Sequence, residues 1–181
     1  QVSEFSIAND ENRTINVVRF NGNEEEIINK AVAEIEDGGI AGIVVNTVKR
    51  AQDLARLVPE NIEVLLLHSA YLAPEREKIE ERLQAKIGKG GMRPQKMIVI
   101  GTQVLEQSLD IDFDVLFTDI APVDLIIQLI GRLHRHKISR PITLAKPTVY
   151  ITGINGYGDY GKGNEFIYEK YLLMKTDHFL K

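Results

Sequence analysis

The stretch that decides the fold of this chain is residues 96–136, KMIVIGTQVLEQSLDIDFDVLFTDIAPVDLIIQLIGRLHRH. It contains two apolar runs of strand length, Met97–Ile100 and Val115–Asp119, and each run delivers polar residues at its end. The segment Pro122–Ile130 then has the length and apolar content of a helix. The stretch therefore predicts two buried strands followed by a helix.

Two arginines stand at the end of this stretch, in the segment Gly131-Arg132-Leu133-His134-Arg135-His136. We expect the helix to continue through them, which would place Arg132 and Arg135, at i and i+3, on one helical face. Two guanidinium groups on one face can bind a single anionic group. A lone pair of arginines is more often a solvated surface feature, so the residues around the pair have to decide between the two interpretations.

Residues 102–110 and 128–135 resemble the fifth and sixth motifs of superfamily 2 helicases. The wording "TQVLEQSLDIDFD" and then "TDIAPVDLIIQLIGRLHRH" is similar to the helicase of type I CRISPR systems, which is often joined to an HD nuclease. The resemblance is strong over residues 96–136 and weaker over most of the remaining chain. One position departs from it, because Leu129 stands where the sixth motif usually has an arginine.

This resemblance implies roles for individual residues. In the family, the arginines of the sixth motif point out of the second RecA-like lobe toward ATP held by the first lobe, so Arg132 and Arg135 are the candidate catalytic residues. Asp110, Gln128 and Gly131 match positions around the nucleotide. ATP and Mg²⁺ would be held mainly by the first lobe, and no cofactor is expected on this fragment alone.

Strand and helix patterns alternate along the chain, which indicates crossover connections and a mainly parallel sheet. We predict an α/β fold, a single RecA-like lobe with about six strands and helices on both faces. The predicted strands are 15–20, 40–45, 62–67, 97–100, 115–119 and 148–152. Asn23 and Glu26 have the spacing of a capping box and predict the start of a helix, and residues 165–175 are predicted as the last helix. Residues 1–181 are taken as one helicase C-terminal domain, with residues 1–13 as a polar tail or interdomain linker.

Polar residues follow four of these strands, and the carboxyl ends of parallel strands gather at one edge of a sheet. By resemblance, five of these residues are expected to contact single-stranded DNA along its backbone: Asn46, Thr47, His68, Ser69 and Thr102. Capping of the following helices is the alternative for each. The interpretation also requires the two arginine side chains to be accessible and directed toward this same edge.

Composition sets limits on the other possibilities. The 181 residues are 44% hydrophobic and 27% charged, as in an ordinary globular domain. No apolar run is long enough for a membrane span, no signal peptide opens the chain, and the absence of cysteine suits a reducing cytoplasm. Because the net charge is -4, nucleic-acid binding has to come from local cations such as Arg132, Arg135, Lys137 and Arg140.

Metal binding is poorly supported. Asp110, Asp112, Asp114 and Asp119 do not follow the spacing of a calcium loop, and we expect strand geometry to scatter them over both faces of the sheet. His134 and His136 have no further ligand at a credible spacing and are interpreted as polar surface groups.

The segment Gly156–Gly163 reads as a phosphate-binding loop except at its last position. Gly163 replaces the hydroxyl residue that would hold Mg²⁺, and the bulky Tyr157 and Tyr160 stand where backbone has to approach phosphate. We therefore interpret this segment as a structural or partner-facing loop.

Together these observations predict the second motor lobe of an ATP-dependent DNA helicase of a type I CRISPR antiviral system, inactive alone. The expected partners are single-stranded DNA, the first RecA-like lobe and, by resemblance, a CRISPR RNA-guided surveillance complex, with no membrane. Two alternatives remain: a lobe of another superfamily 2 RNA or DNA helicase, and a non-catalytic interaction module. Leu129 is the sequence feature that favours the second alternative.

Overall fold

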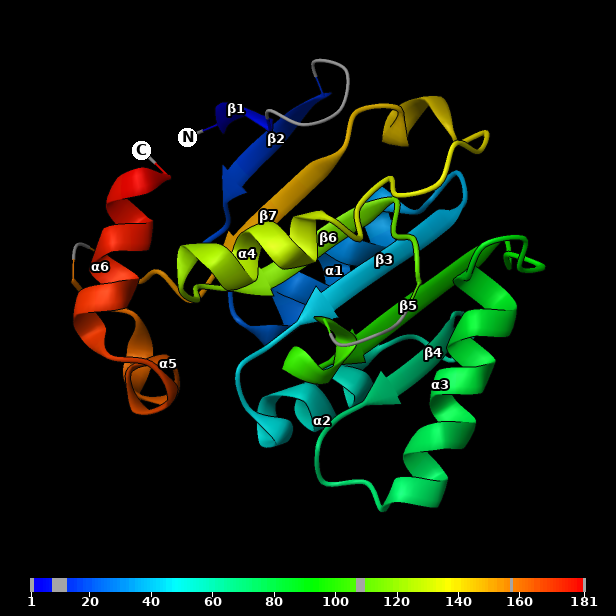
Figure 1. The fold of residues 1–181 in the computed structure, drawn as a ribbon, viewed down its shortest axis with the longest axis horizontal. Coiled ribbons are helices and arrows are strands. Elements are labelled where there is room, and N and C mark those ends of the chain that lie inside the picture. Colours follow the sequence, from blue (N-terminus) through cyan, green and yellow to red (C-terminus); the bar gives the residue numbers. More distant parts are fainter. Residues whose placement is uncertain (1, 8–12, 107–109, 157, 181) are drawn as a thin grey trace.

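A seven-stranded sheet forms the middle layer of the fold (Figure 1). The computed structural model describes residues 2–7, 13–106, 110–156 and 158–180. Within them the strand order is β1-β2-β7-β6-β3-β5-β4, in which β1 is antiparallel to β2 and the other six strands are parallel. The predicted α/β fold with a mainly parallel sheet of about six strands is confirmed.

The helices and strands have the following bounds. The strands are β1 Val2–Ile7, β2 Arg13–Arg19, β3 Gly39–Val44, β4 Glu63–Leu67, β5 Lys96–Gly101, β6 Val115–Asp119 and β7 Thr148–Thr152. The helices are α1 Glu24–Glu34, α2 Val48–Leu57, α3 Ala73–Ile87, α4 Val123–Ile130, α5 Gly161–Ile167 and α6 Lys170–Phe179, with short 3₁₀ turns at Gln103–Glu106 and Ile142–Leu144. No helix among the described residues is both long and apolar enough to cross a membrane.

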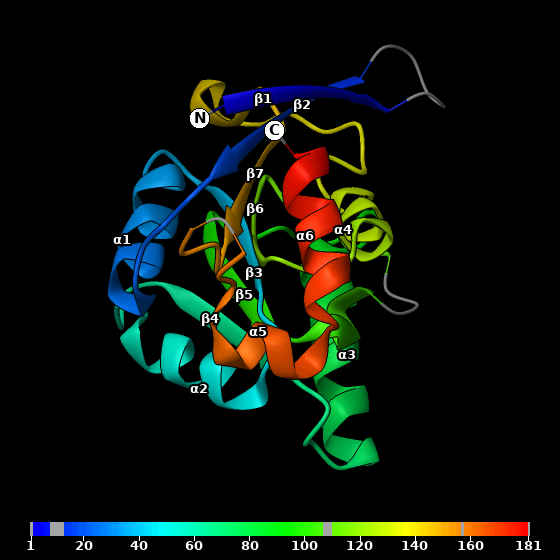
Figure 2. The same cartoon turned by 90° about the vertical axis from the view of Figure 1, so that its left-hand side faces the viewer.

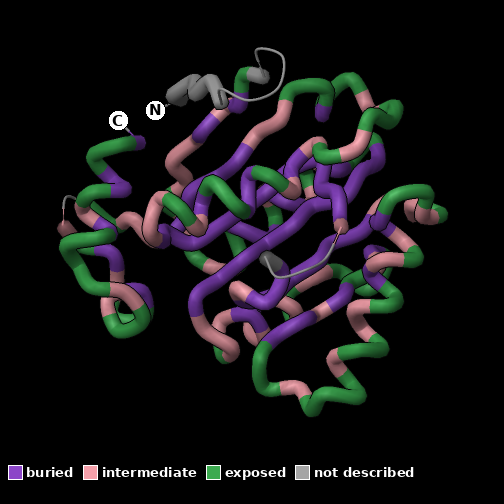
Figure 3. The backbone as a smooth tube through the Cα atoms, in the orientation of Figure 1, coloured by how far each residue is buried: buried purple, intermediate pink, exposed green. Residues whose placement is uncertain are grey.

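Helices cover both faces of the sheet, as Figure 2 shows from the side. Helices α1 and α2 pack on one face through residues such as Ile28 and Leu54, and α3, α4 and α6 pack on the other through residues such as Leu83 and Ile126. The middle strands are therefore buried on both sides, and every residue of β3 is buried (Figure 3). This explains why the central strands read as continuous apolar runs in the sequence.

Helix α1 starts at the capping box that its sequence predicts. The Asn23 side chain accepts a hydrogen bond from the Glu26 backbone N–H at 3.0 Å, and the Glu26 carboxylate accepts one from the Asn23 N–H at 2.8 Å. Two of the backbone donors that a helix start leaves unpaired are thus satisfied.

Two predictions about the ends of the chain are wrong. Residues 1–13 are not simply a polar tail, because Val2–Ile7 form β1 and pair with β2; residues 1 and 8–12 lie outside the described residues. An edge strand of this kind is held by main-chain bonds to one neighbour, so it needs little apolar periodicity. The predicted helix 165–175 is instead divided between α5 and α6, because Tyr168 has an extended backbone, φ −124° and ψ 144°.

The glycine- and tyrosine-rich segment contributes to the core. Tyr160 is buried, with 1% of its surface exposed, and its hydroxyl donates to Asp177 at 3.3 Å. The Gly161 N–H donates to the Asp159 carboxylate at 3.1 Å, where α5 begins. A loop whose tyrosine is packed inside the protein has a structural role, as predicted; Tyr157 lies outside the described residues.

Candidate nucleotide and nucleic-acid sites

The two candidate arginines lie in a turn and not on a helix. Helix α4 ends at Ile130, and His134 has a positive φ of 49°. The Phe113 N–H donates to the Arg132 carbonyl at 2.9 Å, and the His134 N–H donates to the Phe113 carbonyl at 2.9 Å. These bonds to the segment before β6 replace the helical ones, so the prediction of one shared helical face is wrong. The part of the sixth motif after α4 is a turn that is hydrogen-bonded to Phe113, just before β6.

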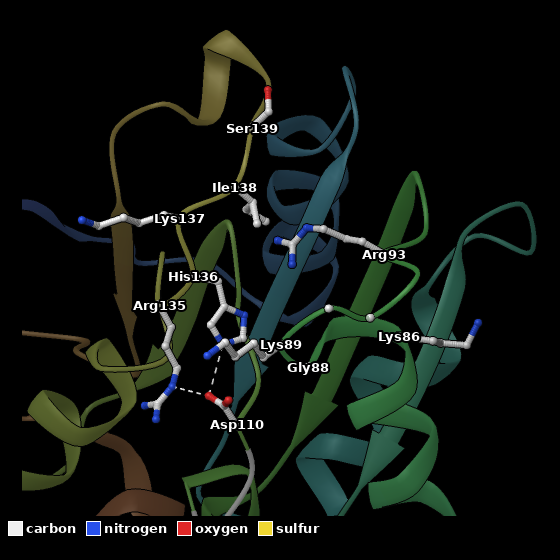
Figure 4. Close-up of a pocket in the computed structure, with 12 residues that line it drawn as sticks. Lys86, Gly88, Lys89, Arg93, Asp110, Arg135, His136, Lys137, Ile138 and Ser139 are labelled. Carbon is white, nitrogen blue, oxygen red and sulfur yellow. Dashed lines mark hydrogen bonds and ion pairs between the residues drawn. The ribbon is translucent and has the colours of Figure 1, made fainter.

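Arg135 keeps an accessible guanidinium and pairs with the other nucleotide-site candidate, Asp110. Its Nε donates to Asp110 Oδ1 at 2.5 Å, and the His136 Nε2 lies 3.1 Å from the same oxygen (Figure 4). The side chains of Arg135 and Asp110 are 41% and 44% exposed. The fifth and sixth motifs thus meet through these residues, while the part of the fifth motif at 107–109 lies outside the described residues.

The Asp110 carboxyl titrates below its ordinary range. The hydrogen bond from His136 lowers the pKa most, burial opposes it as the next-largest effect, and the hydrogen bond from Arg135 and the positive charges of Arg135 and His136 lower it further. Asp110 therefore stays ionised and holds the Arg135 side chain in one place.

A groove of about 920 Å³ lies beside this pair. We call it the basic groove, because six of its lining residues carry basic side chains: Lys86, Lys89, Arg93, Arg135, His136 and Lys137. Figure 4 shows that one wall comes from the loop between α3 and β5 and the other from the segment after α4. Several of these groups are already paired with carboxylates, Lys86 with Glu63, Arg93 with Asp112 and Asp114, and Arg135 with Asp110, so the groove offers local cations and not a net excess of positive charge.

The arginines do not lie at the carboxyl edge with Thr102 and Asn46, so that part of the prediction is wrong. Helix α4 runs back along the sheet from the carboxyl end of β6, and Arg132 ends up hydrogen-bonded to Phe113, just before β6 begins. The five residues of β6 separate the two groups by about 16 Å of main chain. The expected accessibility holds for Arg135, and Arg132 is half-buried.

Asn46 serves the scaffold. Its side-chain amide donates to the Ile120 carbonyl at 2.9 Å and to Asn164 at 2.8 Å, and its oxygen accepts from Gln103 at 2.9 Å. Its backbone N–H donates to the buried Asp119 carboxylate at 3.1 Å. With its side chain buried and its polar atoms paired, Asn46 ties the ends of several strands together and offers little to a ligand.

The other four candidates at this edge divide into buried and accessible residues. Thr102 and His68 are buried, and the His68 ring stacks on Tyr71 with centroids 4.1 Å apart. Thr47 is half-buried and caps α2, accepting from the Arg50 N–H at 3.3 Å, and Ser69 is exposed. Thr47 and Ser69 are therefore the candidates with side-chain surface left for a nucleic acid.

The remaining positions of the sixth motif explain the departure at Leu129. Gln128 and Gly131 are exposed, whereas Leu129 is 3% exposed and packs in the core beneath α4. A leucine at this position stabilises the packing of α4 against the sheet. An arginine there would have to bury its charge or turn its side chain out of the core.

A buried ion cluster lies behind the basic groove, and the sequence reasoning did not find it. Asp112 and Asp114, 0% and 1% exposed, both pair with Arg93 and with Arg140. Arg93 lies 3.0 Å from Asp112 and 2.7 Å from Asp114, and Arg140 lies 2.8 Å from Asp112. Two carboxylates thus face two guanidiniums, so the charges balance without a metal ion.

The spacing of the two aspartates could have indicated this cluster. Residues at i and i+2 of an extended segment point to the same side, which brings Asp112 and Asp114 together. Asp119 instead bonds to Asn46 and Thr152, so the four aspartates do not form one group, as expected. His134 and His136 are not simple surface groups, since the His134 Nε2 lies 2.9 Å from the Asp114 carbonyl. No cluster of three or more metal-ligating side chains occurs in the part of the chain that the structure describes.

Acid should weaken the contact between the two motifs. Because the pKa of Asp110 is lowered in the folded chain, its contribution is present above the ordinary value of 3.8 and is lost as the pH falls below it. The wild-type chain should lose unfolding free energy as the pH falls below 3.8, and Asp110→Asn should lose less, because it has no carboxylate to protonate. The difference between the two chains should be no more than about 1 kcal/mol, since the pair is half-exposed. Urea unfolding of both chains between pH 2 and 6 measures this difference, and identical pH profiles would contradict it.

Comparison with known proteins places this geometry in context. Residues 37–138, more than half of the chain, match the family described as "CRISPR-associated nuclease/helicase Cas3, C-terminal". The Streptococcus thermophilus CRISPR-associated nuclease/helicase Cas3 is 48% identical over 160 residues, which is 87% of this chain and 17% of that protein. This chain therefore spans less than a fifth of that relative.

Solved structures agree with the sequence comparisons. The structure of T. fusca Cas3 with AMPPNP is 29% identical with a TM-score of 0.84, over 97% of this chain and 22% of that one. A chain of a "CRISPR RNA-guided surveillance complex, pre-nicking" is 28% identical with a TM-score of 0.78, over 92% of this chain and 22% of that one.

Proposed function

Because this chain belongs to the family of the CRISPR-associated nuclease/helicase Cas3, at its C-terminal domain, we propose that it is the second motor lobe of an ATP-dependent, single-strand-translocating DNA helicase. The observation that carries the proposal is the exposed Arg135 guanidinium beside Asp110, inside the segment that the family match covers. The full protein would act in the cytoplasm within a type I CRISPR system.

Arg132 and Arg135 fit the chemistry of phosphate. Hydrolysis of ATP spreads negative charge over the transferred phosphoryl group, and a guanidinium fixed beside it stabilises that charge. Arg135 lines the basic groove, is held by Asp110 and has an exposed side chain, so it is available to a nucleotide presented by another lobe. The nucleotide and Mg²⁺ would be held mainly by that lobe. Solved structures of T. fusca Cas3 with ATP, ADP and AMPPNP support this choice of nucleotide.

The arginines do not meet the requirement of a shared edge that the sequence interpretation set, so the proposal places the nucleotide and the DNA strand on different surfaces of the lobe. A translocating enzyme has to hold nucleotide and strand on different surfaces, and the rigid sheet between the two surfaces can transmit a movement of the whole lobe. Thr47 and Ser69 are the residues proposed to contact the DNA backbone, with Asn46, His68 and Thr102 as the buried support beneath them.

Other classes of function are less well supported. Leu129 suggested a module that had lost its motor, but its burial in the core gives the leucine a packing role, which supports the motor over that alternative. A lobe of an RNA helicase would share the fold and the arginines, and the nucleic acid has to be tested directly. The similar chain in the solved CRISPR RNA-guided surveillance complex supports the proposal that an RNA-guided complex recruits the full protein.

The test is a comparison of the full-length protein with this chain. We expect the full-length protein to hydrolyse ATP and to be stimulated more by single-stranded DNA than by RNA of the same sequence. The isolated chain should show no hydrolysis above background, because it supplies only the second half of the site. Robust turnover by the isolated chain would refute the divided site, and stronger stimulation by RNA would refute the DNA substrate.

A further inference from the structure

The backbone N–H groups of Arg135 and His136 share one buried acceptor, the Asp112 carboxylate, while Arg140 donates to the His136 carbonyl at 3.0 Å. Asp112 Oδ1 accepts from the Arg135 N–H at 2.6 Å and from the His136 N–H at 3.3 Å. The Asp112 side chain is 0% exposed, so water does not compete for these bonds. Asp112 thus binds the main chain of Arg135, the residue whose side chain is proposed to act on the nucleotide.

The buried ion cluster in turn fixes Asp112. Arg140 donates to both of its oxygens, at 2.9 and 2.8 Å, and Arg93 lies 3.0 Å from Oδ2. Arg93 belongs to the loop between α3 and β5, and Arg140 follows the segment after α4, so the cluster joins both walls of the basic groove. A carboxylate that is bonded from two sides has one orientation. The N–H groups of Arg135 and His136, which donate to this carboxylate, are therefore held in one position.

Arg135 is thereby held at two points. Asp112 binds its backbone N–H, and Asp110 binds its Nε, although the two aspartates differ in burial. The half-exposed Asp110 can release the guanidinium to a phosphate group, whereas the buried Asp112 has no route to solvent.

From this geometry we propose that Asp112 is a positioning residue for the motor reaction, acting through Arg135. The inference rests on the proposed function, because it assigns Asp112 to the arginine that this function uses. A displaced arginine no longer meets the developing charge, and a misplacement of about 1 Å can cost on the order of 10²-fold in rate.

Asp114 offers a matched control. It is equally buried and shares Arg93 and Arg140 with Asp112. Its carboxylate, however, accepts from the Ile40 N–H and not from the N–H groups of the turn that carries Arg135. Truncation of either aspartate removes one negative charge from the same cluster. Only truncation of Asp112 also removes the side-chain acceptor of the Arg135 and His136 N–H groups.

The experiment measures ATP hydrolysis by the full-length protein with Asp112→Ala or Asp114→Ala, normalised to the folded fraction. Asp112→Ala should lower kcat by on the order of 10²-fold with little change in KM, and Asp114→Ala should leave kcat near the wild-type value. In an Arg135→Ala background, Asp112→Ala should cause no further fall, since the residue it positions is absent. Equal losses from the two aspartates, or additive losses with Arg135→Ala, would overturn the proposal.

Hydrogen exchange gives a second readout that does not depend on hydrolysis. In the full-length protein, the amides of Arg135 and His136 should be protected, and Asp112→Ala should expose them while Asp114→Ala does not. Asp112→Asn and Asp114→Asn make the same comparison if the alanine variants do not fold, and Asp112→Asn should be the milder change because it keeps one acceptor oxygen. Unchanged exchange in the Asp112 variants would overturn the proposal, whereas normal hydrolysis by Arg135→Ala would overturn the proposed role of Arg135 instead.

Discussion

In the full-length protein, Arg132→Ala is expected to lower the rate of ATP hydrolysis by about 10³-fold or more, to a level that is hard to detect. The substitution removes a guanidinium proposed to stabilise the charge that develops on the transferred phosphoryl group. Arg132 is only half-buried and its carbonyl, which accepts from the Phe113 N–H, is kept by alanine. The fold should therefore survive while kcat collapses.

Two further variants make this prediction sharp. Arg56→Ala removes a guanidinium whose side chain is 75% exposed on α2, and it should leave hydrolysis unchanged. Arg132→Lys keeps the positive charge but loses the planar fork, so it should recover only part of the rate. Steady-state hydrolysis with saturating single-stranded DNA is the measurement, and a near-normal rate for Arg132→Ala would remove its assigned role.

Arg140→Ala is expected to reduce the unfolding free energy of this chain by about 3–5 kcal/mol. Arg140 is 7% exposed at its side chain and pairs with both buried aspartates, which are 0% and 1% exposed. Its removal leaves two carboxylates opposite the single guanidinium of Arg93, and an uncompensated buried charge is costly. Urea unfolding followed by circular dichroism measures the loss.

The control for this stability prediction lies on the same segment. Lys137 is exposed and lies three residues before Arg140, so Lys137→Ala should change the unfolding free energy by no more than about 0.5 kcal/mol. A loss of less than about 1 kcal/mol for Arg140→Ala would show that the buried ion cluster contributes little to the fold.

Many of the elements could be predicted because their signals are local. Strand β7 has the predicted bounds, Thr148–Thr152, and β3 is within one residue of its apolar run. The start of α1 follows from the Asn23 capping box. In each case the residues that decide the structure are neighbours in the chain, so their pattern already contains the answer.

The predictions that failed depend on contacts between distant segments. Helix α4 stops at Ile130, although its pattern continues, because the following turn bonds to Phe113. Strand β1 has little pattern of its own and is held by its pairing with β2. The burial of Thr102 and Asn46 follows from the network that joins several strand ends.

The sequence by itself determined the alternation of strands and helices and the identity of the arginine motif, because hydrophobic periodicity and motif spacing are properties of neighbouring residues. Only the tertiary structure decided that Arg135 meets Asp110 and that Asp112 grips the arginine turn. Asp112 finds its partners 19 positions before it, at Arg93, and 28 positions after it, at Arg140. Buried charges have to be neutralised by whatever the fold brings beside them, and one sequence does not reveal which distant residue that is.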